Sequence, residues 1–125
     1  VKGKENKQPI ILLHGFGASS KHWRNNTDYF AKKGYSVYSL DLIGFGNSAQ
    51  PGIKEIGKLD NGVWCNQVSD FIKEVIRPKT SKKIILIGNS LGSLVALTCA
   101  VYLKNEILSV VASPLPDPLV IIFDL

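Results

Sequence analysis

The sequence lacks methionine altogether and contains only two histidines and two cysteines. Because Cys65 and Cys99 lie far apart and form no C-x-x-C pair, we expect buried free thiols rather than a disulfide framework. This cysteine usage fits a reducing compartment, and we predict a cytoplasmic protein. No apolar run reaches the ~20 residues that span a bilayer, so we predict no transmembrane segment, and no signal peptide is visible.

Acidic residues are the minority among the charged ones, and the formal net charge is +5. The lysines are scattered, and no aromatic residues are interleaved with them as they are in nucleic-acid-binding segments. We therefore expect a solvated basic surface and no nucleic-acid partner. Histidines, cysteines and carboxylates form no cluster with ligand spacing, so we predict neither a metal site nor a cofactor. The oligomeric state is left open.

The two ends of the sequence resemble cut ends. Residue 1 is Val, and the sequence stops two residues after the apolar run of residues 119–123. A chain of 125 residues is long enough for one domain with a hydrophobic core. We nevertheless expect it to be part of a longer protein.

Apolar runs alternate with helical segments along the chain. Short β-branched runs predict strands, and capping residues followed by helical periodicity predict helices. The expected strands are residues 10–13, 35–40, 83–87 and 107–112. The expected helices run from Ser19 or Ser20 to 33, from Asp60 or Asn61 to 77, and from Ser90 to 103. Residues 41–60 are expected to form a long loop, and the proline-rich residues 113–118 no regular structure.

The alternation of strands and helices predicts a mostly parallel sheet with helices on both faces. The strands are apolar throughout rather than at every second residue, as expected when both sheet faces are covered. The predicted fold class is therefore α/β, a three-layer sandwich with a mostly parallel sheet.

Residues 88–92, Gly-Asn-Ser-Leu-Gly, match the G-x-S-x-G pattern between a predicted strand and a predicted helix. So tight a turn forces strained backbone angles on Ser90, and the flanking glycines remove side chains that would collide there. The Leu91 amide lies at a helix N-terminus, where an unpaired N–H and the helix dipole favour an oxyanion. The pattern indicates a nucleophilic serine. The structural alternative is a glycine-rich helix start with a capping serine.

A second glycine-rich turn, His14-Gly15-Phe16-Gly17, follows the first predicted strand. Its glycines allow the backbone to approach a substrate closely, and the Phe16 amide is a candidate second donor to the oxyanion. Taken alone, this turn fits a simple glycine loop equally well.

Three motifs in this order resemble the α/β-hydrolase superfamily: residues 14–17, residues 41–48 (Asp-Leu-Ile-Gly-Phe-Gly-Asn-Ser) and residues 88–92. The resemblance implies a partial α/β-hydrolase fold. Residues 1–112 would be the N-terminal part of its core, and residues 113–125 the start of a cap or lid. Asn89 and the segment 113–118 are most similar to the pheophytinase-like serine hydrolases of plants and cyanobacteria. A plant-like protein would then lie in the plastid.

The resemblance also implies roles for individual residues. Ser90 would be the nucleophile that cleaves a carboxylic ester through an acyl-enzyme, with a small-molecule ester as the substrate. Phe16 and Leu91 would supply the backbone N–H groups that bind the oxyanion, and Asp41 would hold the loop beside the site. The residues that would shape the two turns are His14, Gly15, Gly17, Gly88, Asn89 and Gly92.

The residues at positions 90 and 93 distinguish this sequence from some members of the superfamily. Serine at position 90 argues against epoxide hydrolases and haloalkane dehalogenases, because those relatives use a carboxylate as the nucleophile. Ser93 stands where many relatives have glycine, and serine is small enough for the same close packing of helix on sheet.

The catalytic base is missing from this sequence. The family order is serine, acid, histidine, and no histidine follows Ser90. The family uses the equivalent of His14 structurally, and we expect His22 on the surface. Asp117 is a candidate acid, although a loop aspartate in a proline-rich turn is the favoured interpretation. We therefore expect this chain alone to be inactive.

Two other functions stay open at this point. Residues 15–20 fall one glycine short of a dinucleotide-binding G-x-G-x-x-G, with Asp41 where a ribose-binding acid would stand. That half-domain interpretation leaves residues 88–92 without a role. A non-catalytic ligand-binding protein with a hydrolase fold is the other alternative, against which the intact turn around Ser90 argues.

Overall fold

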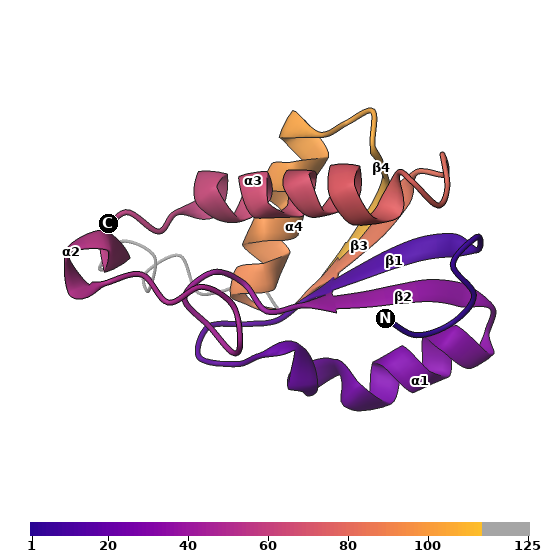
Figure 1. The fold of residues 1–125 in the computed structure, drawn as a ribbon, viewed down its shortest axis with the longest axis horizontal. Helices are drawn as coiled ribbons and strands as arrows, with labels where there is room; N and C mark the ends of the chain where they lie inside the picture. Colours follow the sequence, from indigo (N-terminus) through magenta and orange to yellow (C-terminus); the bar gives the residue numbers. More distant parts are fainter. Residues whose placement is uncertain (114–125) are drawn as a thin grey trace.

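The computed structural model describes residues 1–113, which form a four-stranded parallel sheet flanked by helices (Figure 1). The strands are β1 (Gln8–Leu13), β2 (Tyr35–Leu40), β3 (Ile84–Gly88) and β4 (Ile107–Ala112). Their spatial order is β2-β1-β3-β4, and all three pairings are parallel. The carboxyl ends of the strands therefore meet at one edge of the sheet.

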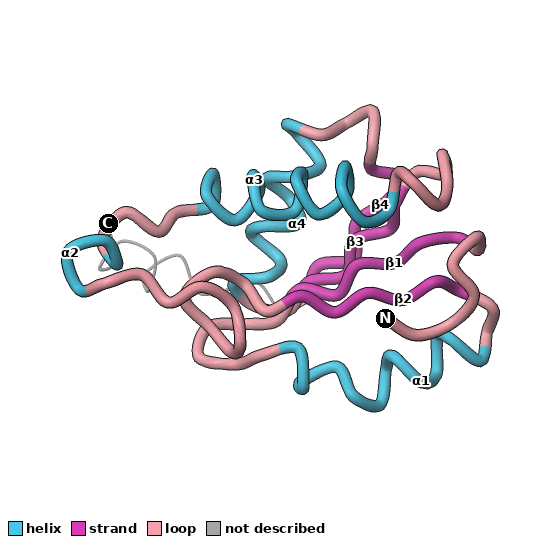
Figure 2. The backbone as a smooth tube through the Cα atoms, in the orientation of Figure 1, coloured by secondary structure: helices cyan, strands magenta, loops and turns pink. Residues whose placement is uncertain are grey.

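Helices cover both faces of this sheet, so the predicted three-layer α/β arrangement is confirmed (Figure 2). The helix α1 (Arg24–Lys32) packs on one face and follows the short 3₁₀ turn η1 (Ser20–Trp23). The helices α3 (Asn61–Phe71) and α4 (Leu91–Tyr102) pack together on the other face. The side chains of Ser19 and Asp60 cap η1 and α3, as the sequence predicts.

The core is divided by the sheet into two layers. On β1, Ile11 and Leu13 join the larger cluster beneath α3 and α4, whereas Ile10 and Leu12 join Trp23 in the cluster beneath the α1 side. Successive side chains of a strand point to opposite faces, so a strand buried on both faces must be apolar at every position. This explains the continuous apolar run of β1.

Three local elements differ from the sequence prediction. The segment predicted as one long loop contains a single helical turn, α2 (Ile53–Ile56), which is too short to show a helical period. The first helix begins as the 3₁₀ turn η1 rather than as an α-helix. The second helix ends in a π-helical turn, η2 (Ile72–Ile76), which buries both Ile72 and Ile76. Burial of both isoleucines depends on tertiary packing that local periodicity does not encode.

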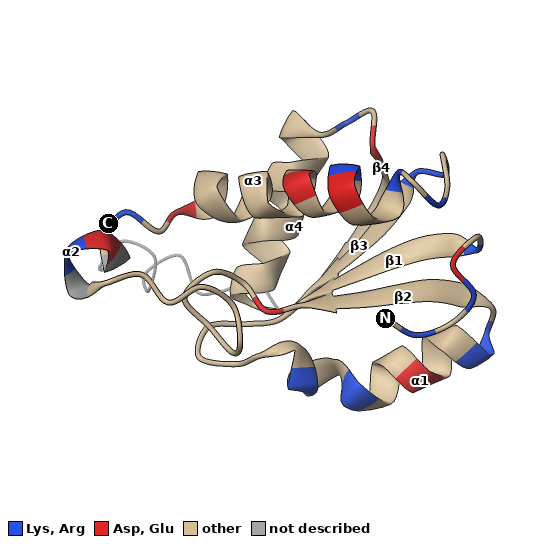
Figure 3. Ribbon diagram, in the orientation of Figure 1, with Lys and Arg blue, Asp and Glu red and all other residues tan. Residues whose placement is uncertain are grey.

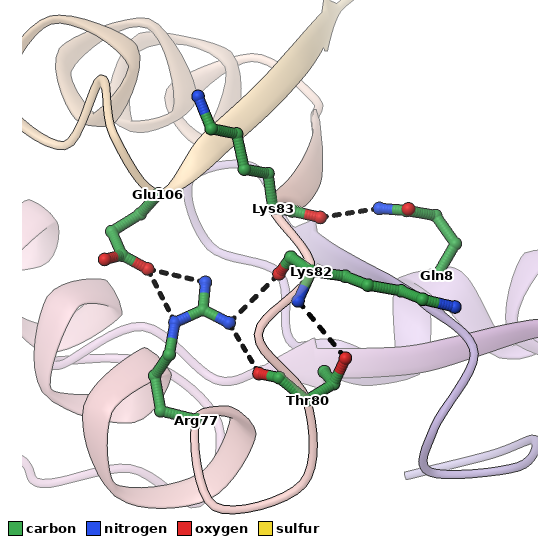
Figure 4. A network of polar contacts seen from close by, with 6 residues as sticks. All are labelled: Gln8, Arg77, Thr80, Lys82, Lys83 and Glu106. Carbon is green, nitrogen blue, oxygen red and sulfur yellow. Dashed lines mark hydrogen bonds and ion pairs between the residues drawn. The ribbon is translucent and has the colours of Figure 1, made fainter.

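A polar network joins three segments at the start of the strands, the end of the sheet remote from Ser90 (Figure 4). Arg77 donates through Nε to Glu106 Oε2 at 2.7 Å, and through Nη1 to the carbonyls of Thr80 at 2.7 Å and Lys82 at 3.0 Å. One guanidinium thus ties the end of η2 to the loop before β3 and to the start of β4.

Charged side chains are confined to the outside of the molecule. Figure 3 shows Lys, Arg, Asp and Glu on the helices and connecting loops, and none lies on the four strands. Within residues 1–113, no helix is both long enough and apolar enough to span a membrane.

The two cysteines are free and buried, as predicted, with Cys65 on α3 and Cys99 on α4. Burial raises the pKa of the Cys99 thiol, and contact with the Cys65 thiol raises that pKa further. Only the thiolate reacts with alkylating reagents. We therefore expect N-ethylmaleimide at pH 7 to leave both cysteines unmodified in the folded protein and to modify both in urea, as measured by peptide mass spectrometry. Prompt modification of Cys99 in the folded state would contradict this packing.

Candidate active site

Ser90 lies in the sharp turn between β3 and α4, at the carboxyl edge of the sheet. Its backbone angles are φ 53° and ψ −117°, and it is the sole non-glycine residue with a positive φ among residues 1–113. Such angles are costly for a residue that carries a Cβ and persist only where the surroundings impose them. The strain predicted from the five-residue pattern is therefore present at Ser90 itself.

Gly88 and Gly92 leave space that the turn requires. A Cβ at position 88 would lie 2.3 Å from the Gly92 carbonyl oxygen, and a Cβ at position 92 would lie 2.1 Å from the Leu13 carbonyl oxygen. Any larger residue at either position would collide with backbone rather than with a side chain that can move. The two glycines allow α4 to begin directly against the end of β1.

The turn of residues 14–17 lies against Ser90. A Cβ on Gly15 would lie 3.2 Å from the Ser90 Cβ, so only glycine allows this approach without displacement. Gly17 has φ 69°, a conformation that favours glycine. Phe16, between the two glycines, is 77% exposed and packs edge-to-face on Phe45. The structure thus brings together two turns that are more than 70 residues apart in the sequence.

Two backbone amides in these turns are available to a ligand. Within the described part of the chain, neither the Phe16 N–H nor the Leu91 N–H donates a hydrogen bond to another residue. The Leu91 amide is the first of α4, where the helix dipole favours negative charge. Unpaired backbone N–H groups of this kind can hold an oxygen that carries negative charge.

His14 is fully buried, and both ring nitrogens are engaged. Its Nδ1–H donates to the Gly15 carbonyl at 2.8 Å, and its Nε2 accepts from the Leu42 N–H at 3.0 Å. The ring also packs edge-to-face on Phe45, with centroids 5.5 Å apart. Because Nε2 already accepts a backbone hydrogen bond, it has no lone pair left with which to take a proton from Ser90.

The other predicted site residues lie elsewhere. His22 is exposed in η1, as predicted, and its ring stacks edge-to-face on Trp23. Asp117, the candidate acid, lies outside the described residues, as does nearly all of the predicted cap segment 113–125. The cavity of about 340 Å³ bounded by Ser69, Ile72 and Tyr102 lies toward the start of β4 and away from Ser90.

Asp41 joins the two loops beside Ser90. Its Oδ1 accepts the Ser20 N–H at 2.6 Å, and its Oδ2 accepts the Asn47 N–H at 2.9 Å. Partial burial would raise the pKa of Asp41, but these two backbone donors outweigh it and hold the pKa below the usual 3.8. Both carboxylate oxygens are therefore used within the loops, which disfavours the ribose-binding role of the dinucleotide alternative.

The substitution Asp41→Asn tests this role through its pH dependence. Because the pKa of Asp41 is depressed in the folded state, its contribution to stability is present above the pKa of the unfolded chain. That contribution is lost as pH falls through the folded-state pKa. We expect the variant to have a lower urea midpoint than the wild type at pH 7, with the difference shrinking below about pH 4. A difference that stays constant down to pH 2 would contradict the role of the charge.

Sequence reasoning missed the side chains that support these loops. Gln67 on α3 accepts from the Ile43 N–H at 3.0 Å and donates to the Asp41 carbonyl at 3.0 Å, while the Trp64 indole donates to the Ile43 carbonyl at 2.9 Å. Ser93 is fully buried, and its hydroxyl accepts from the Ser113 N–H. Gln67 and Ser93 are polar residues on the inner faces of predicted helices, and this placement could have indicated that their side chains bind nearby loops.

Known proteins resemble this chain in sequence and in architecture. The chain is 34% identical over 116 residues to epoxide hydrolase 4 of Mus musculus, which covers 93% of this chain and 30% of that protein. It is 33% identical over 105 residues to 2-hydroxy-6-oxo-6-(2'-aminophenyl)hexa-2,4-dienoic acid hydrolase of Metapseudomonas resinovorans, with 82% and 33% covered. Its structure matches that of a membrane phospholipase A, a bacterial virulence factor, with a TM-score of 0.77, 29% identity, and 89% and 33% covered.

The chain spans about a third of the length of these relatives. Over residues 8–120 its sequence matches the family described as the alpha/beta hydrolase fold. That match includes all four strands, both glycine-rich turns and the strained serine between β3 and α4. The chain therefore belongs to the alpha/beta hydrolase fold family.

Proposed function

We propose that this chain supplies the nucleophile and the oxyanion-binding amides of a serine hydrolase that cleaves carboxylic esters. The observation that carries the proposal is Ser90, a serine held at φ 53° with the Gly15 backbone packed against it. Strain of this kind requires compensation elsewhere in the fold, and it is typical of residues that a reaction needs in one fixed position.

The proposed reaction proceeds through an acyl-enzyme. The Ser90 hydroxyl oxygen attacks the ester carbonyl carbon while a base takes its proton, and the carbonyl oxygen becomes an oxyanion held by the Phe16 and Leu91 amides. Collapse of this tetrahedral intermediate expels the alcohol, which regains a proton from the base. Water then attacks the acyl-enzyme in the same manner and releases the carboxylic acid.

The base is proposed to be a histidine outside residues 1–125. The sequence contains two histidines, and neither suits the role. His14 Nε2 accepts the Leu42 N–H, and His22 is exposed in η1. The relatives are about three times as long as this chain, which leaves room in a longer polypeptide for both a base and its orienting acid. Without them, we expect residues 1–125 to show no hydrolysis.

A nucleophilic serine also favours esters over epoxides. Attack by a serine oxygen on an epoxide would leave an alkyl ether on the enzyme, which water does not cleave under mild conditions. Attack by a carboxylate leaves an ester, which water does cleave. The similarity to epoxide hydrolase 4 therefore supports the fold and the hydrolase class, whereas the hydroxyl at position 90 supports acyl transfer.

The substrate within the ester class is a narrower proposal. Thioesters, lactones and simple acyl esters all suit the mechanism, and the similarity of Asn89 and the segment 113–118 to pheophytinase-like hydrolases would favour chlorophyll-derived esters. A non-catalytic ligand-binding protein is the competing function, since a hydrolase fold can bind a small molecule without cleaving it.

The test is covalent labelling of the full-length polypeptide that contains this chain. After incubation with a fluorophosphonate, intact-mass analysis should show one adduct, and peptide mapping should place it on Ser90. The unlabelled polypeptide should release acid from a p-nitrophenyl ester. This activity should fall as labelling proceeds and should stop when labelling is complete. Absence of both adduct and turnover would favour the ligand-binding alternative.

A further inference from the structure

Ser113, the residue that follows β4, is held by three residues that surround Ser90 in the sequence. Its N–H donates to the Gly88 carbonyl at 3.1 Å and to the Ser93 hydroxyl at 3.0 Å. Its carbonyl accepts from Asn89 Nδ2 at 3.0 Å. Both polar groups of the Ser113 backbone are thus bound by residues two before, one before and three after Ser90.

The side chain of Asn89 also contacts the other side of the site. A Cβ on Gly15 would lie 3.2 Å from Asn89 Oδ1, and the Asn89 N–H donates to the Leu13 carbonyl at 3.1 Å. Asn89 therefore lies between the turn that carries the Phe16 amide and the point where the chain leaves β4. Its size and its donor group set the separation between the two.

Ser93 completes this arrangement from the first turn of α4. Its side chain is fully buried, yet its hydroxyl oxygen has a partner in the Ser113 N–H. Alanine or glycine at position 93 would pack as well against the sheet but could not accept this bond. The hydroxyl therefore does something that close packing of helix on sheet does not require.

Because Ala112 pairs with Gly88, Ser113 leaves β4 next to the turn that carries Ser90. We infer that Asn89 and Ser93 are positioning residues that fix Ser113 there as one wall of the approach to the nucleophile. This inference rests on the proposed function. The Asn89 side chain holds the Ser113 carbonyl, and the Ser93 hydroxyl shares the Ser113 N–H with the Gly88 carbonyl. Loss of either side-chain bond therefore loosens Ser113 relative to Ser90. The Ser90 hydroxyl itself stays in place, because its position depends on Gly88, Gly92 and Gly15.

The test compares Asn89→Asp and Ser93→Ala in the full-length polypeptide. Asn89→Asp keeps the size of the side chain but replaces the donor that faces the Ser113 carbonyl with an acceptor. Ser93→Ala removes one of the two acceptors of the Ser113 N–H and leaves the Gly88 carbonyl as the other. The matched control is Asn66→Asp, the same substitution at an exposed position on α3. Each variant is assayed with p-nitrophenyl esters of increasing acyl length and with the small reagent diisopropyl fluorophosphate.

Loss of one such hydrogen bond should raise KM for the esters by about 3- to 10-fold, while kcat and the rate of Ser90 phosphonylation change less than about twofold. Because both variants release the same residue, the effects of the double variant should be clearly non-additive. Asn66→Asp should match the wild type in every assay.

Three results would overturn the inference in different ways. If the wild type is phosphonylated and active but phosphonylation and ester hydrolysis fall together in both variants, the residues hold Ser90 itself and not the approach to it. An unchanged KM in both variants would likewise exclude the positioning role. If the wild type is neither phosphonylated nor active, the proposed function has failed, and the positioning role fails with it.

Discussion

Ser90→Ala should lower ester hydrolysis by the full-length polypeptide by about 10⁴- to 10⁶-fold and should abolish fluorophosphonate labelling. The loss is this large because the Ser90 hydroxyl is the proposed nucleophile, and alanine has no oxygen to replace it. The oxyanion-binding amides belong to the backbone and survive the substitution, so a residual rate above that of water is expected. The measurement is kcat/KM for a p-nitrophenyl ester alongside quantified labelling.

The matched control is Ser81→Ala, the same change in the exposed loop before β3. It should keep full activity and full labelling. Because alanine retains a Cβ at the strained position, Ser90→Ala should also unfold at nearly the wild-type urea concentration. Labelling that persists in Ser90→Ala would show that another residue is the nucleophile, even if the hydrolase assignment holds.

Gly92→Ala should destabilise the protein by about 3 kcal/mol or more, which is at the upper end for a single added methyl group. The new Cβ would lie 2.1 Å from the Leu13 carbonyl oxygen and 2.7 Å from that of His14. Both atoms belong to the backbone at the end of β1, so relief requires α4 to move away from the sheet. The measurement is the free energy of unfolding in urea, or the soluble yield if the variant does not fold.

Gly57→Ala is the corresponding control. Gly57 has φ −67°, and a Cβ there would meet no atom within 4 Å. Alanine should therefore change stability by no more than about 0.5 kcal/mol, with a small gain from reduced freedom of the unfolded chain. Equal stability of the two variants would mean that α4 does not start against β1 as described.

The sheet could be predicted from the sequence because a strand that is buried on both faces has apolar residues at every position. The run of residues 10–13 is apolar at every position and is buried, whereas β4 is partly exposed and is predictable only from its mostly apolar residues. The short helix α2 and the π turn η2 have no comparable pattern of residue types. Their residues take these conformations because of neighbours that are remote in the sequence, and local patterns hold no information about those neighbours.

The glycine-rich turns of the candidate site could be predicted from the sequence, but the side-chain hydrogen bonds that hold its loops could not. The glycines at 15, 88 and 92 are visible in the sequence because each occupies a place where a Cβ has no room. The hydrogen bonds of Gln67 to the 41–48 loop, and those of Ser93 and Asn89 to Ser113, depend on how helices and loops meet in space. The two nitrogens of His14 could be assigned partners only once Leu42 was found beside it.

The positive φ at Ser90 has a consequence for how such a chain changes over generations. Glycine adopts this conformation without the penalty of about 1–3 kcal/mol that a residue with a Cβ carries. In a lineage with no use for the hydroxyl, substitution by glycine would be favoured, because it raises stability at no functional loss. Serine at this position is therefore expected to persist only under selection for its chemistry, and a glycine there in a descendant sequence would mark the loss of that chemistry.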